Sequence, residues 1–363
     1  MFNNQYNGKK VLITGHTGFK GTWLTTWLLE LGATVVGVSK DIPTTPSMFE
    51  VLGIEEKIKH YIQDVRDEQG LKTIITEEKP DFIFHLAAQA IVSKSYSDPV
   101  DTITTNVLGT TNVLEALRKI NPDCIAIIIT SDKCYDNIEQ VWGYKENDPM
   151  GGKDIYSSSK GAAELLIKSY FYSFFNAEKS NVKLGICRAG NVIGGGDWAS
   201  DRIVVDCVKA WSQKEVVEIR SPNATRPWQH VLEPLSGYLA LGQKLAEGAD
   251  MHGEAFNFGP RAEQNRTVLE LLQDLSNGWD ITQAYEVTDN IPFHEAGLLK
   301  LNCDKALSNM KWQATMNYQQ TVQYTGRWYL DYYQGMTTMY DKTVQQIENY
   351  QVLAKTQQAL WTV

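Results

Sequence analysis

Residues 10–24 read KVLITGHTGFKGTWL and place Gly15, Gly18 and Gly21 between a strand pattern and a helix pattern. In a nucleotide-binding loop the first glycine permits a tight turn, and the second lets the backbone approach a pyrophosphate. The third permits close packing of helix and strand, and the first N–H groups of the helix attract anions. Three glycines alone are weak evidence, but their place between strand and helix favours a dinucleotide-binding loop. The cofactor candidates in it are Gly15, Thr17, Gly18, Phe19 and Gly21.

Short β-branched runs alternate with helix patterns through the first half of the chain. The strand candidates are 10–15, 33–39, 59–64, 81–87, 124–131 and 182–188. Such alternation is typical of a parallel sheet that is covered by helices on both faces. We therefore predict an α/β fold, with a Rossmann-like doubly wound parallel sheet and a smaller α/β substrate-binding domain.

The alternation ends after Arg188. Loop-like segments then cover 190–202, 226–235 and 256–265, and a helix pattern at 232–248 lies among them. We expect these later segments to build the smaller domain. The predicted division is a nucleotide-binding domain at 1–187 plus 229–256, a substrate domain at 188–228 plus 257–345, and a C-terminal tail at 346–363.

The composition limits the possible partners. The formal net charge of −9 and a pI near 5.3 argue against nucleic acid or an anionic membrane as the main partner. The polar start MFNNQYNGKK predicts no signal peptide, and no apolar run approaches the ~18 residues of a membrane span. The 5 cysteines are scattered, which is typical of reduced thiols in a cytoplasmic protein and predicts no metal site.

Residues 155–166 read IYSSSKGAAELL and put Tyr156 and Lys160 four residues apart, on one face of a predicted helix. A tyrosine acts as a general base near neutral pH only if its phenolate is stabilised. A lysine one turn away, together with a nicotinamide cation, would provide this. The YxxxK pattern is common, but its place after a glycine loop and before a long apolar helix makes it a strong signal. Tyr156 and Lys160 are therefore candidate catalytic and cofactor-binding residues.

With these features the chain resembles the extended short-chain dehydrogenase/reductases, whose glycine loop has the same GxxGxxG spacing. More closely, and over nearly its whole length, it resembles the CDP-glucose 4,6-dehydratases. The resemblance is carried by GHTGFKGTWL, HLAAQ, SDKCYDN, VWGYKENDPMGG, YSSSKGAAEL, RAGNVIGGGDW and RPWQHVLEPLSGYL. It implies NAD as cofactor, a nucleotide-linked hexose such as CDP-glucose as substrate, and a homo-oligomer (dimer or tetramer). It also implies a role in deoxysugar synthesis for surface polysaccharide such as lipopolysaccharide.

The stretch TSDKCYDN, residues 130–137, follows the buried strand pattern CIAIII. Sugar-nucleotide 4,6-dehydratases carry Thr/Ser-Asp-Glu here, and the CDP-glucose branch has lysine in place of glutamate. The resemblance implies that Asp132 protonates the leaving C6 hydroxyl, Lys133 removes the C5 proton, and Ser131 hydrogen-bonds the C4 oxygen. A lysine must be neutral to accept a proton, and its ordinary pKa of ~10.4 opposes that. A charged Lys133 that stabilises an enolate is therefore an alternative, as is a simple surface ion pair with Asp132.

The other strand ends supply further cofactor candidates. Asp41 could bind a ribose hydroxyl, while the neighbouring Lys40 could meet a 2′-phosphate. Asp64 and Val65 are candidates for adenine, with a helix N-cap as the alternative. The resemblance implies that Asn106 supports the catalytic tyrosine, again with a helix cap as the alternative. It also implies that the cofactor contacts Leu86, Ala87, Ala88 and Gln89.

Substrate candidates come from polar residues, most of them in the later loops. Arg226 is the preferred residue for a charge-assisted contact with phosphate, although a surface arginine is more often only solvated. The chain has Ala90 and Ile155 where the family commonly has proline, and this affects the finer contacts. The full set of substrate candidates is Gln89, Asn191, Arg202, Arg226, Asn257 and His294.

Two other functions compete with dehydration. A sugar-nucleotide 4-epimerase shares the NAD loop and the Tyr–Lys pair, but it has no use for an acid–base pair at C5 and C6. A catalytically silent NAD-binding regulator would share the fold, and the intact Tyr156 and Lys160 disfavour it. We therefore predict an NAD-dependent hydro-lyase.

Overall fold

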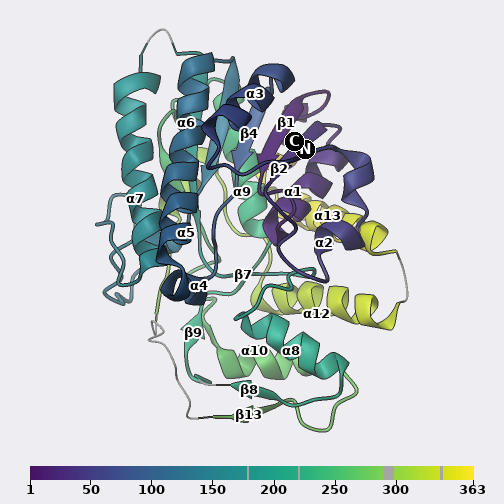
Figure 1. The fold of residues 1–363 in the computed structure, drawn as a ribbon. Helices are drawn as coiled ribbons and strands as arrows, with labels where there is room; N and C mark the ends of the chain where they lie inside the picture. The colour runs from purple at the N-terminus through teal and green to yellow at the C-terminus, as the bar shows by residue number, and fades with distance from the viewer. Residues whose placement is uncertain (178–179, 220, 289–297, 336–337) are drawn as a thin grey trace.

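The computed structural model describes residues 1–177, 180–219, 221–288, 298–335 and 338–363 (Figure 1). Its centre is a seven-stranded sheet in the order β11-β6-β5-β4-β1-β2-β3, in which all neighbouring strands are parallel. The strands are β1 (Lys10–Thr14), β2 (Thr34–Ser39), β3 (Lys59–Ile62), β4 (Phe82–His85), β5 (Cys124–Ile129), β6 (Val182–Ala189) and β11 (Ala255–Phe258). The chain runs outward from β1 through β2 to β3 and then builds the other half from β4. The predicted doubly wound α/β class is therefore confirmed.

The strand β11 (Ala255–Phe258) overlaps the segment 256–265 that we expected to be loop-like, and that expectation was wrong for residues 256–258. Four residues are too few for a strand pattern to stand out from the sequence alone. Pairing with β6 decides the conformation, since Phe256 lies opposite Cys187 and Phe258 opposite Ala189. Both phenylalanines are fully buried, so the strand is held by packing as well as by its hydrogen bonds.

The outer edge of β11 is closed by charged side chains. The N–H of Asn257 donates a hydrogen bond of 2.8 Å to the carboxylate of Glu146. The ammonium group of Lys305 donates a hydrogen bond of 2.8 Å to the carbonyl of Ala255. Two backbone groups that could bind an eighth strand are therefore already satisfied.

Helices cover both faces of the sheet (Figure 1). One face carries α3 (Glu68–Glu78), α6 (Gly109–Ile120) and α7 (Ile155–Tyr170), and the other carries α1 (Phe19–Glu30), α9 (Leu232–Ala246) and α13 (Met339–Thr356). Successive strand residues point to opposite faces. Leu12 therefore packs on the first face and Val11 and Ile13 on the second. Among the described residues, no helix is both long and apolar enough to cross a bilayer.

A smaller region lies beyond the carboxyl ends of the strands, at the bottom of Figure 1. It contains α8 (Ile203–Ser212), α10 (Val268–Ser276), β8 (Val217–Ile219) paired with β13 (Tyr285–Val287), and β9 (Thr225–Arg226) paired with β12 (Arg266–Thr267). The two-stranded pair of β7 (Val192–Ile193) and β10 (Gln229–His230) follows β6. The remaining α-helices are α2 (Met48–Val51), α4 (Val92–Ser97), α5 (Pro99–Ile103), α11 (Asp304–Met310) and α12 (Tyr318–Gln334). The proposed domain boundaries stay a prediction.

The segment 346–363, which we expected to form a C-terminal tail, instead continues α13 and ends in a short 3₁₀ turn, Leu360–Thr362. Ile347 and Tyr350 are fully buried, and the indole of Trp361 stacks on Phe2 with ring centres 5.1 Å apart. The apolar residues are widely spaced in a polar sequence, so the amphipathic pattern is weak. Packing against α1 and the N-terminal turn determines this helix.

Glu233, in the first turn of α9, is a buried carboxylate that ties three segments together. It accepts hydrogen bonds from the backbone N–H groups of Thr315 (2.9 Å) and Met316 (2.6 Å), and from the hydroxyl of Tyr350 (3.0 Å). Burial raises the pKa of Glu233 to about 7, although these three hydrogen bonds act to lower it. The sheet domain and the C-terminal segment are therefore joined by a group that titrates near neutral pH.

We expect Glu233 to make the protein less stable as the pH rises from about 4.5 to about 7. In this range the folded chain keeps the proton and the unfolded chain has lost it, so a higher pH favours unfolding. Glu233→Gln should flatten this slope, although it lowers stability overall because one amide N–H group would face a backbone N–H. Urea unfolding of both proteins at pH 5 and pH 8 measures the slopes. Equal slopes would contradict the assignment.

Candidate active site

The predicted functional residues gather at the carboxyl ends of the central strands. Gly15 follows β1, Leu86 follows β4, and Ser131 lies two residues beyond β5. The register of β1 with β4 and of β4 with β5 brings these ends to one edge of the sheet. Open α/β sheets bind their ligands at this edge.

At each of the three loop glycines, a side chain would meet different surroundings. Gly15 has a φ of +79°, and a Cβ there would lie 2.7 Å from the backbone nitrogen of Ala87. A Cβ on Gly21 would lie 2.1 Å from the carbonyl oxygen of Gly15, so α1 packs directly on the loop. A Cβ on Gly18 would meet only one atom of the described chain, at 3.4 Å, and no side chain caps α1. The space before the first N–H groups of α1 is thus left for an anionic group.

His16, which sequence analysis did not single out, is a buried support of the loop. Its Nδ1 lies 2.9 Å from the hydroxyl of Ser39, and its Nε2 lies 2.6 Å from Nδ1 of His60. Burial lowers the pKa of His16 to about 3, so its imidazole is neutral. A Cβ on Gly37 would lie 2.3 Å from the His16 ring. A glycine inside a strand pattern was the only signal for this contact.

The loop is also tied to the end of β2. The hydroxyl of Thr17 donates a hydrogen bond of 2.8 Å to the carbonyl of Asp41. Asp41 itself is exposed, as a residue that binds a ribose hydroxyl needs to be. Phe19 packs beneath the glycine-rich segment after β7, where a Cβ on Gly194 would lie 3.1 Å from its ring.

Asp64 and Val65 lie beyond β3, and neither of them caps a helix. The N-cap of α3 is Asp67, which accepts a hydrogen bond from the N–H of Gly70. The carboxylate of Asp64 is instead paired with Arg66, with N–O distances of 2.6–3.1 Å. This pairing holds the pKa of Asp64 below its ordinary value. Contact of Asp64 and Val65 with adenine stays a prediction.

Asn106 lies inside a π-helical turn, Thr104–Leu108, and is not a helix cap. Its amide donates to the carbonyl of Gln89 (3.0 Å) and the hydroxyl of Ser159 (2.9 Å), and its carbonyl accepts from the N–H of Gln89 (2.8 Å). Ser159 donates in turn to the carbonyl of Tyr156 (2.7 Å). Asn106 therefore joins the loop after β4 to the helix with the Tyr–Lys pair. Single π-turns of this kind are frequent at functional sites.

The segment after β4 is held by its own hydrogen bonds. The N–H groups of Leu86 and Ala87 donate to the carbonyl and the hydroxyl of Thr14, at 3.0 and 3.3 Å. Leu86, Ala87 and Ala88 are half-buried. The side-chain amide of buried Gln89 donates to the carbonyl of Ile91 (3.0 Å) and to the hydroxyl of Thr102 on α5 (2.8 Å), so it is used within the protein.

Tyr156 and Lys160 lie one turn apart on α7, and both are buried. Burial raises the pKa of Tyr156 to about 12, which a hydrogen bond with Ser131 partly offsets. Burial lowers the pKa of Lys160 to about 8, although the negative charge of the Glu164 carboxylate acts to raise it. Tyr156 is therefore a neutral phenol in contact with the Ser–Asp–Lys segment unless a further positive charge lies beside it.

Ser131, Asp132 and Lys133 form a tight turn over the end of β5. The hydroxyl of Ser131 accepts from the N–H of Lys133 (3.2 Å) and lies 3.0 Å from the Asp132 carboxylate. Burial raises the pKa of Asp132, and the charge of Lys133 opposes this. A Cβ on Gly190 would lie 2.8 Å from the same carboxylate, so the glycine makes room for it. A buried carboxyl with a raised pKa suits a proton donor.

The sequence model of the GDP-mannose 4,6 dehydratase family matches residues 12–325. The chain belongs to this family. It is 44% identical to the CDP-glucose 4,6-dehydratase of Salmonella typhimurium over 335 residues, which cover 92% of this chain and 93% of that protein. It is 26% identical to the CDP-paratose 2-epimerase of Salmonella typhi over 318 residues, which cover 79% of this chain and 88% of that protein.

Solved structures of the same fold include a dehydratase and an epimerase. A dTDP-glucose 4,6-dehydratase from Streptomyces venezuelae, with NAD bound, aligns with a TM-score of 0.75 and 19% identity, over 91% of this chain and 99% of that one. The epimerase Mth375 of Methanothermobacter thermautotrophicus aligns with a TM-score of 0.80 and 21% identity, over 92% of this chain and 95% of that one. These similarities show the shared fold.

In this dehydratase-family chain, Arg202 and Asn191 border the Ser–Asp–Lys turn. The guanidinium of Arg202 lies 3.2 Å from the carboxylate of Asp197, and its charge opposes the rise that burial causes in the pKa of Tyr156. Arg202 is thus close to the phenol of Tyr156 and already paired with an acidic group. Asn191 follows Gly190 and is half-buried.

Arg226 lies farther along the chain, on β9, opposite Arg266 of β12. Its guanidinium donates a hydrogen bond of 2.9 Å to the carbonyl of Thr225. Its contact with the substrate phosphate stays a prediction. His294 lies outside the described residues.

Asn257 is fully buried, and its side chain is used within the protein. Its carbonyl accepts a hydrogen bond from Tyr135 (2.8 Å), and its amide donates to the carbonyls of Tyr144 (2.8 Å) and Asn302 (3.1 Å). These bonds leave its amide N–H groups no capacity for the nucleotide contact that we expected. Its position on β11, which sequence analysis missed, explains the difference.

Lys20, in the first turn of α1, is a further charged residue of the site that we did not assign. Its pKa is lowered to about 8, first by burial and next by the charge of Arg202, while Asp132 raises it. The only sequence signal was a lysine inside the glycine loop, in GFKG.

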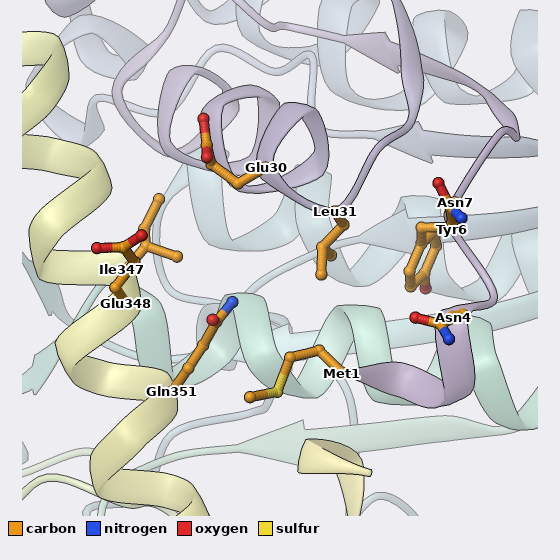
Figure 2. A pocket seen from close by; sticks show the side chains of 9 residues that line it. All are labelled: Met1, Asn4, Tyr6, Asn7, Glu30, Leu31, Ile347, Glu348 and Gln351. Carbon is orange, nitrogen blue, oxygen red and sulfur yellow. The ribbon is translucent and has the colours of Figure 1, made fainter.

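The cavity drawn in Figure 2 is separate from this site. It has a volume of about 260 Å³ and lies between the N-terminal turn, the end of α1 and α13. Glu30 and Leu31, which line it, lie at the opposite end of α1 from Gly18. The length of α1, ~18 Å, separates the cavity from the glycine loop.

We expect Gly21→Ala to lower the free energy of unfolding by about 1–3 kcal/mol, because the added methyl group would overlap the carbonyl of Gly15. Gly18→Ala is the matched control, since its methyl group meets no close atom, and it should cost less than about 1 kcal/mol. Chemical unfolding of both variants measures the difference. Equal losses would show that α1 does not depend on the close contact at Gly21.

Proposed function

We propose that the protein is a cytoplasmic, NAD-dependent dehydratase that converts CDP-glucose to CDP-4-keto-6-deoxyglucose. The observation that carries this proposal is the packing of α7, which bears the candidate oxidation pair Tyr156 and Lys160, directly against the turn that bears the candidate elimination pair Asp132 and Lys133. The likeness to the CDP-glucose 4,6-dehydratase supports the choice of substrate. The product would enter deoxysugar synthesis for surface polysaccharide such as lipopolysaccharide.

The residues at the sheet edge fit NAD. Gly18 leaves the start of α1 without a side-chain cap, which suits a pyrophosphate, and exposed Asp41 suits a ribose hydroxyl. Asp64 and Val65 would face the adenine, and Lys160 the ribose of the nicotinamide. Bound NAD would supply the chemistry that the chain lacks, because it accepts hydride from C4 of the sugar and returns it to C6.

Tyr156 is the proposed base for the C4 hydroxyl. Its pKa of about 12 must fall for it to take a proton near neutral pH, and a cation beside it would favour the phenolate. Lys160 and Arg202 supply positive charge from the chain. Ser131 would hydrogen-bond the C4 oxygen as the carbonyl forms.

Loss of water then needs an acid at C6 and a group that assists departure of the C5 proton. Asp132 is the proposed acid, since burial favours its protonated form. Lys133 would either accept the C5 proton or stabilise the enolate as a cation. The C4 carbonyl acidifies the C5 hydrogen, so a strong base is not required. The atoms balance as one water lost, with no net oxidation.

A 4-epimerase and a silent NAD-binding regulator are less well supported. An epimerase gains nothing from a buried acid next to the catalytic tyrosine. A regulator gains nothing from the whole set of Ser131, Asp132, Tyr156 and Lys160 at one edge of the sheet.

Incubation with NAD and CDP-, dTDP-, UDP- or GDP-glucose, followed by mass spectrometry, tests the proposal. We expect CDP-glucose alone to lose one water. Unchanged mass with a rearranged sugar would indicate an epimerase, and no reaction with any of the four would favour a regulator.

In the same assay, Asp132→Asn should slow elimination by about 10²–10⁴-fold, because the amide cannot donate a proton as an acid. Quenched samples should then contain the oxidised sugar that has lost two hydrogens and kept its C6 hydroxyl. The elimination rate of the unaltered protein should also fall as the pH rises above the raised pKa of Asp132. A variant that forms product at the normal rate would rule Asp132 out as the acid.

We also propose a homodimer through the helices on the left of Figure 1, α5 to α7. Val100 and Ile103 on α5 are 68% and 44% exposed, and Leu165 on α7 is 57% exposed. The helices α5 and α7 pack against each other, so a second copy that covers them would bury these exposed apolar side chains.

Leu165→Glu should weaken this dimer and shift the mass in solution toward the 40.9 kDa of one chain. The control is Val352→Glu on α13, where the valine is 65% exposed on the other side of the sheet. Light scattering after size-exclusion chromatography measures both. A mass that Leu165→Glu leaves unchanged would place the interface elsewhere.

A further inference from the structure

An ion pair between Glu164 and Arg188 lies beneath the proposed active site. The side chains are 4% and 2% exposed. The guanidinium binds both carboxylate oxygens, with Nε–Oε1 at 2.8 Å and Nη2–Oε2 at 3.0 Å. Glu164 follows Tyr156 and Lys160 at the same four-residue spacing on α7, so the pair begins directly behind the catalytic face.

One arm of this ion pair reaches the start of the Ser–Asp–Lys turn. The hydroxyl of Thr130, the residue before Ser131, donates a hydrogen bond of 2.5 Å to Glu164 Oε1. The backbone N–H of Thr130 also donates a hydrogen bond of 2.9 Å to the carbonyl of Cys187 on β6. The entry to the turn is therefore bound to α7 and to β6 together.

A second arm reaches the end of the turn. Arg188 Nη1 donates a hydrogen bond of 2.7 Å to the hydroxyl of Tyr135, and its guanidinium carbon lies 5.0 Å from the centre of that ring. Between the two arms, α7 comes close to the turn itself. A Cβ on Gly161 would lie 3.3 Å from the carbonyl oxygen of Cys134.

Stability alone does not explain this arrangement. Taking two charged groups out of water costs several kcal/mol, and an apolar pair of similar volume often serves folding as well. What an apolar pair could not do is hold two polar partners, Thr130 and Tyr135, in fixed directions. Both carboxylate oxygens and three guanidinium nitrogens of the ion pair are used in this way or between themselves.

We propose that Glu164 and Arg188, acting through Thr130 and Tyr135, are positioning residues for the reaction. They fix the elimination pair, Asp132 and Lys133, at a set distance from the oxidation pair, Tyr156 and Lys160. None of the four touches the reacting atoms. The inference rests on the proposed dehydratase function, because only a reaction with two separate steps needs the two pairs in register.

The test uses Thr130→Val and Tyr135→Phe, which remove one hydroxyl each and leave the ion pair intact. Thr325→Val and Tyr6→Phe are the controls, since both remove a buried hydroxyl that bonds a backbone carbonyl away from the site. Single-turnover samples with NAD and CDP-glucose are quenched and analysed by mass spectrometry. We expect elimination to slow by about tenfold in the two test variants, because small misplacements of catalytic groups are costly. Oxidation at C4 should change little, so the oxidised sugar with its C6 hydroxyl accumulates.

Hydrogen exchange of the protein without ligands provides a second readout. Amides of residues 130–136 should exchange about fivefold faster in the test variants, as expected for the loss of one hydrogen bond. Amides of α13 should be unaffected. If the unaltered protein dehydrates CDP-glucose but the test variants slow both steps equally, or neither step, the positioning role is wrong. If the unaltered protein does not react, the proposed function fails. In that case the exchange experiment still tests the two arms: faster exchange confined to residues 130–136 supports them, and unchanged exchange rejects them.

Discussion

Gly15 and Ala87 bring the ends of β1 and β4 into direct backbone contact. A side chain on Gly15 would overlap the nitrogen of Ala87, so the chain can turn here only without one. This turn sets the direction of α1. The first N–H groups of α1 then face the edge of the sheet at which β5 ends and Ser131 follows. The indole of Trp23 on α1 donates to the carbonyl of Gly195 (2.9 Å) and extends the same contact to the segment after β7. The glycine loop, the Ser–Asp–Lys turn and part of the smaller region are therefore arranged around one close approach of two strands.

Burial moves the ionisable groups of the site in one direction, toward their neutral forms. It raises the pKa of Tyr156 and of Asp132 and lowers that of Lys160. A charge that arrives with a ligand then acts across short distances in weakly screening surroundings. The site is thus suited to chemistry that begins when a positively charged partner is bound.

The sheet and the catalytic motifs were predictable because their signals are local. Strand–helix alternation predicted six of the seven strands of the sheet, and the four-residue spacing of Tyr156 and Lys160 predicted that they share one face of α7. The remaining features depend on contacts between distant segments. The strand β11 and the residues beyond 346 are ordered by neighbours that a short or polar pattern does not reveal.

The same distinction holds within the site. His16 is placed by His60 and Ser39, and Asn257 is used by Tyr135 and Tyr144, partners that are far away in the sequence. A resemblance to a family can suggest that a residue is important. It does not say whether the side chain faces a ligand or completes a buried network, because that depends on the strand register.

The charged closure of β11 has a consequence for how the molecule meets other molecules. Glu146 and Lys305 occupy the N–H of Asn257 and the carbonyl of Ala255 at this side of the sheet, which opposes the addition of a strand from another chain. The opposite border, β3, is only four residues long and begins with an exposed lysine, Lys59. Both borders are thus poor templates for a strand from another chain, which disfavours fibre-like stacking of this sheet.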